Sequence, residues 1–258
     1  MKVKKLCSIL LAFVLAFMFT TNSLAVNTDS DEIVVKASEA PSTVLEVLEH
    51  YEVDVDDDSL IYVISNPDVD TARSTGNPLS SLTVVTKSGN LVQQDILTAF
   101  SDDANGTTTN LDFRNLFVQT RAGHVAEFLY ANVFLRATTS FESYTSGGYT
   151  YVRPLGQYFT VTNNGGASAP SRVYVRTDIV GSLYSKSGSD YTYLQGDYYY
   201  SNPQTVSYPS FNTVYSRNNA LPSNRVIRPD PYGNTGFQVY MEMTINGVPY
   251  YDSRIVYY

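Results

Sequence analysis

The order of apolar and polar residues predicts β-strands through most of the second half of the chain. Apolar residues alternate with polar or aromatic ones in three segments, 128–136, 173–179 and 237–245. Successive side chains of a strand point to opposite faces of a sheet, so each segment has an apolar face that can pack on a core. Shorter candidate strands lie at 116–121, 149–153, 158–162 and 191–200. We therefore expect a mainly β protein, with an antiparallel β-sandwich or open barrel over about residues 116–258.

The first half of the chain combines one helix with a few strands. Ser42 can act as an N-cap, and the apolar residues that follow it recur at helical spacing, which predicts a helix over about 42–52. The apolar run 60–65 predicts a strand, and the segments 81–86 and 91–100 flank a Lys-Ser-Gly-Asn sequence that is typical of a hairpin loop. Residues 41–101 are thus expected to form a small, acidic α+β region.

Three segments lack these periodicities. Residues 26–40 are acidic, and we expect them to form a mobile acidic tail. Residues 102–115 are polar and contain a glycine, which indicates a linker or a long loop. Residues 201–231 hold five prolines and are expected to form a long connection that covers the sheet edges.

Asn246-Gly247 follows an alternating strand and predicts a hairpin. A simple two-residue turn would place Asp252 opposite Met241 and Arg254 opposite Val239, so that charged residues would lie on the apolar face. We therefore expect a bulge or a longer loop that shifts the register by one residue.

The first 25 residues have the composition of a secretory signal peptide. Three lysines precede a 14-residue apolar stretch, residues 6–19, and the segment ends in Ser23-Leu24-Ala25. A helix of that length spans about 21 Å, which is short of the ~30 Å hydrocarbon core of a bilayer. We expect cleavage after Ala25, a secreted protein and no membrane span after cleavage.

Charge and aromatic residues divide the chain into two unequal parts. Cleavage would remove three lysines and take the net charge from −8 to −11, which disfavours nucleic acid as a partner. It would also remove Cys7, the only cysteine, and with it thiol chemistry and disulfides. Residues 26–115 carry 17 acids and 4 bases, whereas 20 of the 22 tyrosines follow residue 115. This division fits either two domains in contact or one domain with an acidic first part.

The carboxylates of the sequence suggest two candidate sites, one for calcium binding and one for hydrolysis. The alternating Asp54, Asp56 and Asp58 could provide oxygen ligands for calcium, although Ser59 stands where an EF-hand needs glycine. We expect a solvated acidic loop there, and no other cofactor. Glu127, Glu142 and Glu242 could supply the two carboxyl groups of a small secreted hydrolase of the glycosidase kind.

The tyrosines are the most unusual feature of the sequence. Tyrosine has an apolar ring and a polar tip and is well suited to recognition surfaces. The candidate ligand-binding residues are Tyr149, Tyr151, Tyr191, Tyr193, Tyr198 and Tyr200. We expect a non-enzymatic extracellular binding protein whose partner is a protein, a cell-wall polymer or a glycan. The nearly uncharged segment 191–200 also leaves open a self-assembling toxin or matrix protein, of undetermined oligomeric state.

Overall fold

The structure, a computed structural model, describes residues 32–65, 80–100, 113, 116–117, 133–163, 168–230 and 236–258. Its helical elements are the 3-10 helix η1 (Ala37–Glu39) and the helix α2 (Ser42–His50). Its strands are β1 (Glu32–Lys36), β2 (Leu60–Ser65), β3 (Ser80–Ser88), β4 (Leu91–Phe100), β5 (Val133–Ser146), β6 (Tyr149–Asn163), β7 (Arg172–Ser187), β8 (Asp190–Ser207), β9 (Tyr215–Arg217), β10 (Arg225–Pro229), β11 (Phe237–Ile245) and β12 (Val248–Ile255). The expected signal segment 1–25 and most of the expected linker 102–115 lie outside the described residues.

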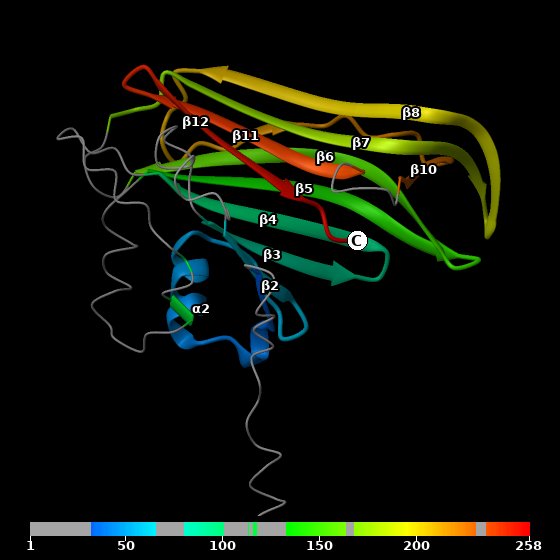
Figure 1. Cartoon of the computed structure of the whole chain (residues 1–258), viewed down its shortest axis with the longest axis horizontal. Helices are drawn as coiled ribbons and strands as arrows, with labels where there is room; N and C mark the ends of the chain where they lie inside the picture. The colour runs from blue at the N-terminus through cyan, green and yellow to red at the C-terminus, as the bar shows by residue number, and fades with distance from the viewer. Residues whose placement is uncertain are drawn as a thin grey trace, which may run out of the picture.

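Within these residues, twelve strands join in one sheet that folds over on itself (Figure 1). Strands β1 to β6 follow one another in chain order and form a first layer. The second layer contains β8, β7, β11 and β12, and β12 crosses in front of the first layer in Figure 1. Strand β10 joins the two layers because it pairs with β6 on one side and with β7 on the other. The prediction of a mainly antiparallel β protein of the sandwich or open-barrel kind is confirmed.

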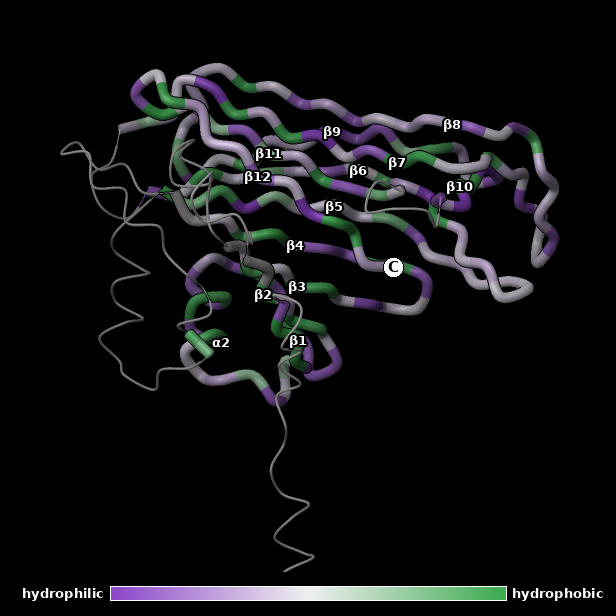
Figure 2. The backbone as a smooth tube through the Cα atoms, in the orientation of Figure 1, coloured by the Kyte–Doolittle hydropathy of each residue, from purple (hydrophilic) through white to green (hydrophobic). Residues whose placement is uncertain are grey.

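The first layer is covered on both faces, and this gives the protein two cores. Ile96 and Phe159 point toward the second layer and belong to the larger core. The opposite face of this layer carries Leu97 of β4 and Phe134 of β5, which belong to the core around α2 and its buried Leu48. Figure 2 shows hydrophobic stretches in green along the strands, separated by pale or purple ones. Burying each of these large side chains contributes about 1.5–3 kcal/mol.

The predicted helix and first strands are confirmed, with α2 at Ser42–His50 and the hairpin of β3 and β4 turning at residues 89–90. Strand β4 then pairs with β5 through ten residue pairs. The acidic region and the tyrosine-rich region therefore share one sheet.

The acidic segment before the helix is more ordered than its charge indicates. Residues Glu32–Lys36 form β1, which pairs with β2, and residues Ala37–Glu39 form η1. Val35 and Ala37 are buried in the core around α2. The prediction of a mobile tail is therefore wrong for residues 32–40, because a short apolar run outweighs the surrounding acidic residues; residues 26–31 lie outside the described part.

Two other segments differ from their predicted conformation. The expected long connection 201–231 contains the end of β8 and the short strands β9 and β10. Its Pro203 lies on β8, which pairs with β7 alone among the described strands. Proline is tolerated on such an edge strand because no described partner there needs its missing N–H. The candidate strand 116–121 is described only at Leu116 and Phe117, where the backbone is helical.

The β11–β12 hairpin keeps the simple register, so the predicted shift is wrong. Met241 lies opposite Asp252 and Val239 lies opposite Arg254. The charges are accepted inside the protein because Arg254 and Asp252 form an ion pair of 2.8 Å. Thr98 of β4 also donates a hydrogen bond of 2.9 Å to Asp252. Paired and hydrogen-bonded, the two charges no longer oppose burial as isolated charges would.

Side chains close the open edges of the two layers. The side-chain amide of Gln94 makes the two hydrogen bonds that a neighbouring strand would make. It donates to the carbonyl of Ile255 at 2.9 Å and accepts from the N–H of Tyr257 at 2.9 Å. On the other edge, Asn219 donates to the carbonyl of Ser201 at 3.2 Å, and Arg217 donates to the carbonyl of Pro203. These contacts tie β12 to β4 and the end of β8 to the segment that follows β9.

Candidate functional site

The two longest hairpins end at the same side of the molecule and bend toward each other there (Figure 1). One is the β5–β6 hairpin and the other is the β7–β8 hairpin, and β10 lies between them. We call this the tyrosine-rich end. It consists of Tyr144, Tyr149, Tyr151, Tyr184, Tyr191 and Tyr193, with Glu142, Arg153, Lys186, Val226 and Arg228. Figure 2 shows this end as mostly pale or purple, in contrast to the green stretches of the body.

The tyrosine rings hold the two hairpins together. Tyr151 of β6 stacks on Tyr191 of β8, with ring centroids 4.1 Å apart, although β10 and β7 lie between these strands in the sheet. Tyr184 contacts Tyr151 edge to face at 5.2 Å and Tyr193 at 5.7 Å. Tyr151, Tyr184 and Val226 form a small third core. A ring contact between non-neighbouring strands requires the sheet to curl, so this face is concave.

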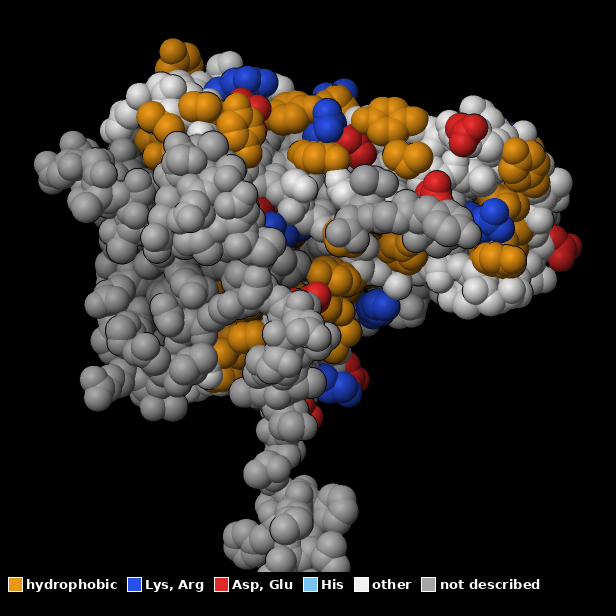
Figure 3. Space-filling view, in the orientation of Figure 1, with side chains coloured by type: hydrophobic (Ala, Val, Ile, Leu, Met, Phe, Trp, Pro, Cys, Tyr) orange, Lys and Arg blue, Asp and Glu red, His pale blue; other side chains and the backbone are white. Residues whose placement is uncertain are grey.

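The outermost rings of this end remain open to solvent. Tyr149 and Tyr193 are 54% and 58% exposed. Hydrophobic side chains, a class that includes tyrosine, lie beside acidic and basic ones at this end in the space-filling view (Figure 3). Exposed aromatic rings on a rigid support are favourable for binding, because they offer a large contact area with few rotatable bonds.

Cations lie on the faces of these rings. The guanidinium of Arg228 lies 4.8 Å from the ring centre of Tyr149 and 5.5 Å from that of Tyr184. The ammonium of Lys186 lies 4.4 Å from the ring centre of Tyr144. Among the described residues, no carboxylate is within ion-pair distance of Arg228, so its N–H groups can serve a ligand.

A polar triad borders the aromatic rings. Arg153 donates a hydrogen bond of 2.6 Å to Glu142, which also accepts a hydrogen bond from the hydroxyl of Tyr144. The bond from Arg153 lowers the pKa of Glu142. Burial, followed by the bond to Glu142, raises the pKa of Tyr144 to about 12. Glu142 is therefore held as an anion at neutral pH and Tyr144 as a neutral phenol.

A pocket of 460 Å³ opens where β6 and β10 diverge. The two strands pair only at Val152 and Ile227 and separate beyond that point. The pocket is lined by Gly148, Tyr149, Thr150, Val180, Gly181, Ser182, Asp197, Arg228, Pro229, Asp230 and Tyr258. Its volume lies within the range of about 300–1,000 Å³ that is typical of small-molecule sites.

Two backbone features shape the pocket. A Cβ atom on Gly181 would lie 2.1 Å from the carbonyl oxygen of Arg228, so only glycine allows β10 to approach β7 this closely. Asp197 has a φ of 48° and lies where β8 carries extra residues opposite Ser182. Aspartate tolerates this left-handed conformation better than most residues, and such bulges re-aim side chains near functional sites.

The structure brings together four of the six predicted binding residues. Tyr149, Tyr151, Tyr191 and Tyr193 lie at the tyrosine-rich end.

Tyr198 and Tyr200 do not join them, because register shifts in the β7–β8 hairpin place these residues opposite Gly181 and Ile179. Tyr198 packs against the main core, and buried Tyr200 donates a hydrogen bond of 2.7 Å to the carbonyl of Asn219. Burial raises the pKa of the Tyr200 hydroxyl. The structure does not bring these two residues to the tyrosine-rich end, and their role in binding stays a prediction.

Sequence reasoning missed Arg228 and Asp197. Arg228 lies in a segment that is expected to be a long connection, because Arg-Val-Ile-Arg has neither strict alternation nor an apolar run long enough to predict a strand. Asp197 follows Gly196 in the middle of a tyrosine-rich strand. A glycine inside a strand pattern is a recognised signal of a bulge, and it could have located Asp197.

The candidate calcium ligands do not converge. Asp58 faces Lys36 at 3.4 Å, and Asp56 accepts a hydrogen bond of 2.8 Å from Ser59. The carbonyl of Asp54 accepts a hydrogen bond from Thr86 at 3.4 Å. Within the described ranges, no three His, Cys, Asp or Glu side chains gather as a metal site would require.

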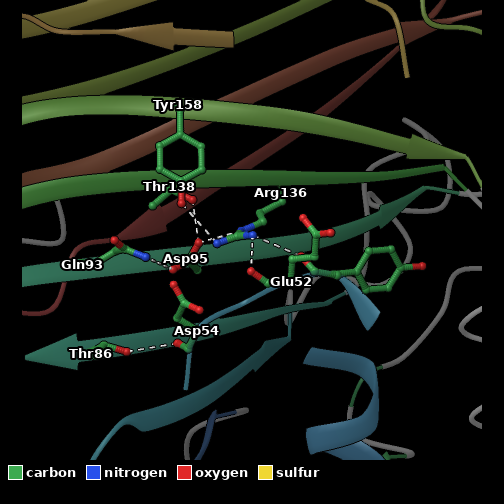
Figure 4. A network of polar contacts seen from close by, with 9 residues as sticks. Glu52, Asp54, Thr86, Gln93, Asp95, Arg136, Thr138 and Tyr158 are labelled. Carbon is green, nitrogen blue, oxygen red and sulfur yellow. Dashed lines mark hydrogen bonds and ion pairs between the residues drawn. The ribbon is translucent and has the colours of Figure 1, made fainter. Parts of the chain in front are cut away.

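A second polar network lies next to the end of α2 and resembles an active site in composition (Figure 4). Arg136 donates to Asp95 at 2.8 Å and to the carbonyls of Tyr51 and Glu52 at 3.1 and 2.6 Å. Thr138 donates to Asp95 at 2.6 Å. The carboxylate is buried and accepts several hydrogen bonds, and the arginine binds the carbonyls of the two residues that follow the helix. We assign the network to docking of α2 on the sheet.

Two of the three carboxylates proposed for a hydrolase are paired with arginines. Glu142 pairs with Arg153, and Glu242 accepts a hydrogen bond of 3.0 Å from Arg172. They lie on β5 and β11, which belong to different layers. Glu127 lies outside the described residues. The structure therefore gives no support to a catalytic pair made of Glu142 and Glu242.

Comparisons with known proteins add no identity to this geometry. No family model matches the sequence, no curated protein matches it, and no solved structure matches the fold. Over the described ranges, neither helix is long and apolar enough to cross a membrane.

Proposed function

We propose that this chain is a secreted, non-enzymatic binding protein that recognises an extracellular partner through its tyrosine-rich end. One observation carries the proposal. Tyr149, Tyr193 and Arg228 lie on a concave face, where both tyrosines are more than half exposed and the guanidinium has no carboxylate partner among the described residues. The export-type N-terminal sequence supports an extracellular partner. The small core of Tyr151, Tyr184 and Val226 beneath the face keeps it rigid, which lowers the entropy cost of binding.

The proposal is tested by the retention of the purified protein on immobilised mucin, peptidoglycan and fibronectin. We expect retention on at least one of them. The double variant Tyr149→Ala/Tyr193→Ala should lower the retained fraction at least tenfold, because it removes the exposed rings.

The matched control is Tyr208→Ala/Tyr251→Ala. These rings are 79% and 49% exposed but lie outside the tyrosine-rich end, so retention should be unchanged. Equal losses in the two double variants, or full retention of the first, would reject the proposal.

A hydrolase remains the second candidate because two carboxyl groups, those of Asp197 and Asp230, line the same pocket. A glycosidase needs two carboxyl groups about 5–10 Å apart across the scissile bond. Incubation with neutral tetrasaccharides, followed by chromatography of the products, tests this candidate. Cleavage that is lost in both Asp197→Asn and Asp230→Asn would replace the non-enzymatic proposal.

Self-assembly is the third candidate. The segment Tyr191–Tyr200 belongs to β8, which pairs with β7 alone in the described sheet. Sedimentation of the full chain over a hundredfold range of concentration checks it, and a constant monomer would reject it.

A further inference from the structure

We infer that the pocket between β6 and β10 binds a neutral sugar ring of a glycan. This inference rests on the proposed function and names the ligand class of the tyrosine-rich end. The pocket combines one aromatic residue, one cation that has no carboxylate partner within the described part of the chain, and two aspartates.

The aromatic wall provides the apolar part of the site. Tyr149 lines the pocket and is 54% exposed, and the guanidinium of Arg228 lies 4.8 Å from its ring centre. A sugar ring has C–H faces that pack on such a ring, while its hydroxyl groups extend from the rim. The ring therefore selects a flat ligand whose polar groups lie at the edge.

The polar groups of the pocket match hydroxyls better than they match a net charge. Arg228 offers N–H donors, whereas Asp197 offers a carboxylate acceptor. A phosphate or uronate would face two carboxylates, and a cationic ligand would face the guanidinium. A hydroxyl both donates and accepts, so a neutral polyol satisfies both kinds of group at once.

The pocket is formed before any ligand arrives. Gly181 allows the backbones of β7 and β10 to lie in contact at its wall. The left-handed residue Asp197 is fixed between paired stretches of β7 and β8. Preformed polar groups cost little reorganisation on binding, which favours weak, polar ligands such as sugars.

The test is calorimetric titration of the full chain with six tetrasaccharides. Four are neutral: cellotetraose, maltotetraose, mannotetraose and chitotetraose. Two carry charge: the glucosamine tetramer, which is chitotetraose without its acetyl groups, and tetragalacturonic acid. We expect one-to-one binding of at least one neutral probe, at least tenfold tighter than either charged probe.

Variants locate the binding. Tyr149→Ala and Asp197→Asn should each weaken the affinity at least tenfold. Asparagine tolerates the left-handed conformation of residue 197, so this variant keeps the bulge. The matched controls Tyr208→Ala and Asp190→Asn should change the affinity less than twofold. Near-ultraviolet circular dichroism and the melting temperature confirm that each variant is folded.

The outcomes separate the inference from the proposed function. Binding of a charged probe that still depends on Tyr149 would overturn the neutral sugar and leave the tyrosine-rich end as the binding surface. Binding that Tyr149→Ala, Tyr193→Ala and Asp197→Asn all leave intact would overturn both. No binding of any neutral probe would overturn the inference, and the retention assay would then decide the proposed function.

Discussion

In the body of the sandwich, buried arginines face carboxylates, whereas at the tyrosine-rich end Arg228 faces the rings of Tyr149 and Tyr184. Arg136 contacts Asp95 at 2.8 Å, and Arg254 contacts Asp252 at 2.8 Å. These two arginines of the body are each matched by a carboxylate. At the end, the π-faces hold the cation in position but do not neutralise it.

The two regions also differ in what packs against the faces of the sheet. In the body, the first layer is covered by α2 on one face and by the second layer on the other. At the end, the concave face has only its own small core of Tyr151, Tyr184 and Val226. The difference teaches that the same residue types are paired and buried where both faces are covered, and stay accessible to solvent where one face is open.

The largest expected effect concerns the buried ion pair of the body. Asp252→Ala should lower the free energy of unfolding by about 3–5 kcal/mol, because it leaves Arg254 buried without its partner. Urea unfolding at pH 7 measures the change. The double variant Asp252→Leu/Arg254→Met should lie within about 1 kcal/mol of the wild type or above it.

The control at the other region is Arg228→Met, which should cost less than about 1 kcal/mol because only cation–π contacts are lost. If this change costs as much as Asp252→Ala, the contrast between the regions is wrong.

The next largest effect is the loss of stability when a leucine is truncated in each of the two regions. Leu48 of α2 is buried against the sheet, whereas Leu194 of β8 is exposed at the tyrosine-rich hairpin. Leu48→Ala should lower the free energy of unfolding by about 2–5 kcal/mol, since it leaves a cavity. Leu194→Ala should change it by less than about 0.5 kcal/mol. Thermal and urea unfolding of both variants check the comparison, which similar losses would contradict.

The smallest effect is a difference in pH dependence. The hydrogen bond from Arg153 lowers the pKa of Glu142, so the folded state binds fewer protons there than the unfolded state. Its contribution to stability is present above the unfolded pKa of 4.5 and is lost as the pH falls through the lower folded value. Glu142→Gln should therefore destabilise the protein by less than about 1 kcal/mol at pH 7 and by nothing in strong acid.

Asp252 should show the opposite slope. Burial raises the pKa of Asp252 above its ordinary value of 3.8, so its contribution weakens as the pH rises from 3.8 through the folded value. Urea unfolding of the wild type, Glu142→Gln and Asp252→Ala, each measured from pH 2 to 7, separates the contributions of the two carboxyls. Slopes of the same sign would show that the two carboxyls share one kind of environment.

Much of the fold follows from local patterns in the sequence. Alternation predicts the strands around Val175 and Met241, and helical spacing predicts α2 at Ser42–His50. These elements are predictable because one face of each is apolar and buried. The enrichment in tyrosine also identifies Tyr149 and Tyr193 as binding candidates, which the structure places at one end.

The remaining features depend on contacts between distant residues. The register of β11 and β12 follows from the pairing of Asp252 with Arg254 and from Thr98, which lies 154 residues away in the chain. A local apolar pattern cannot show that a charged pair will be neutralised inside. Tyr200 is buried for a similar reason, since register shifts in a hairpin decide which tyrosines face outward.

The side chains that bind the edge of β8 also protect the protein in concentrated solution. A fibril that grows by strand addition needs a free row of backbone carbonyl and N–H groups as its template. Asn219 and Arg217 occupy the carbonyls of Ser201 and Pro203, and Pro203 has no N–H to offer. An incoming strand would therefore find its docking row interrupted along the second half of β8, even though this strand is long and nearly uncharged.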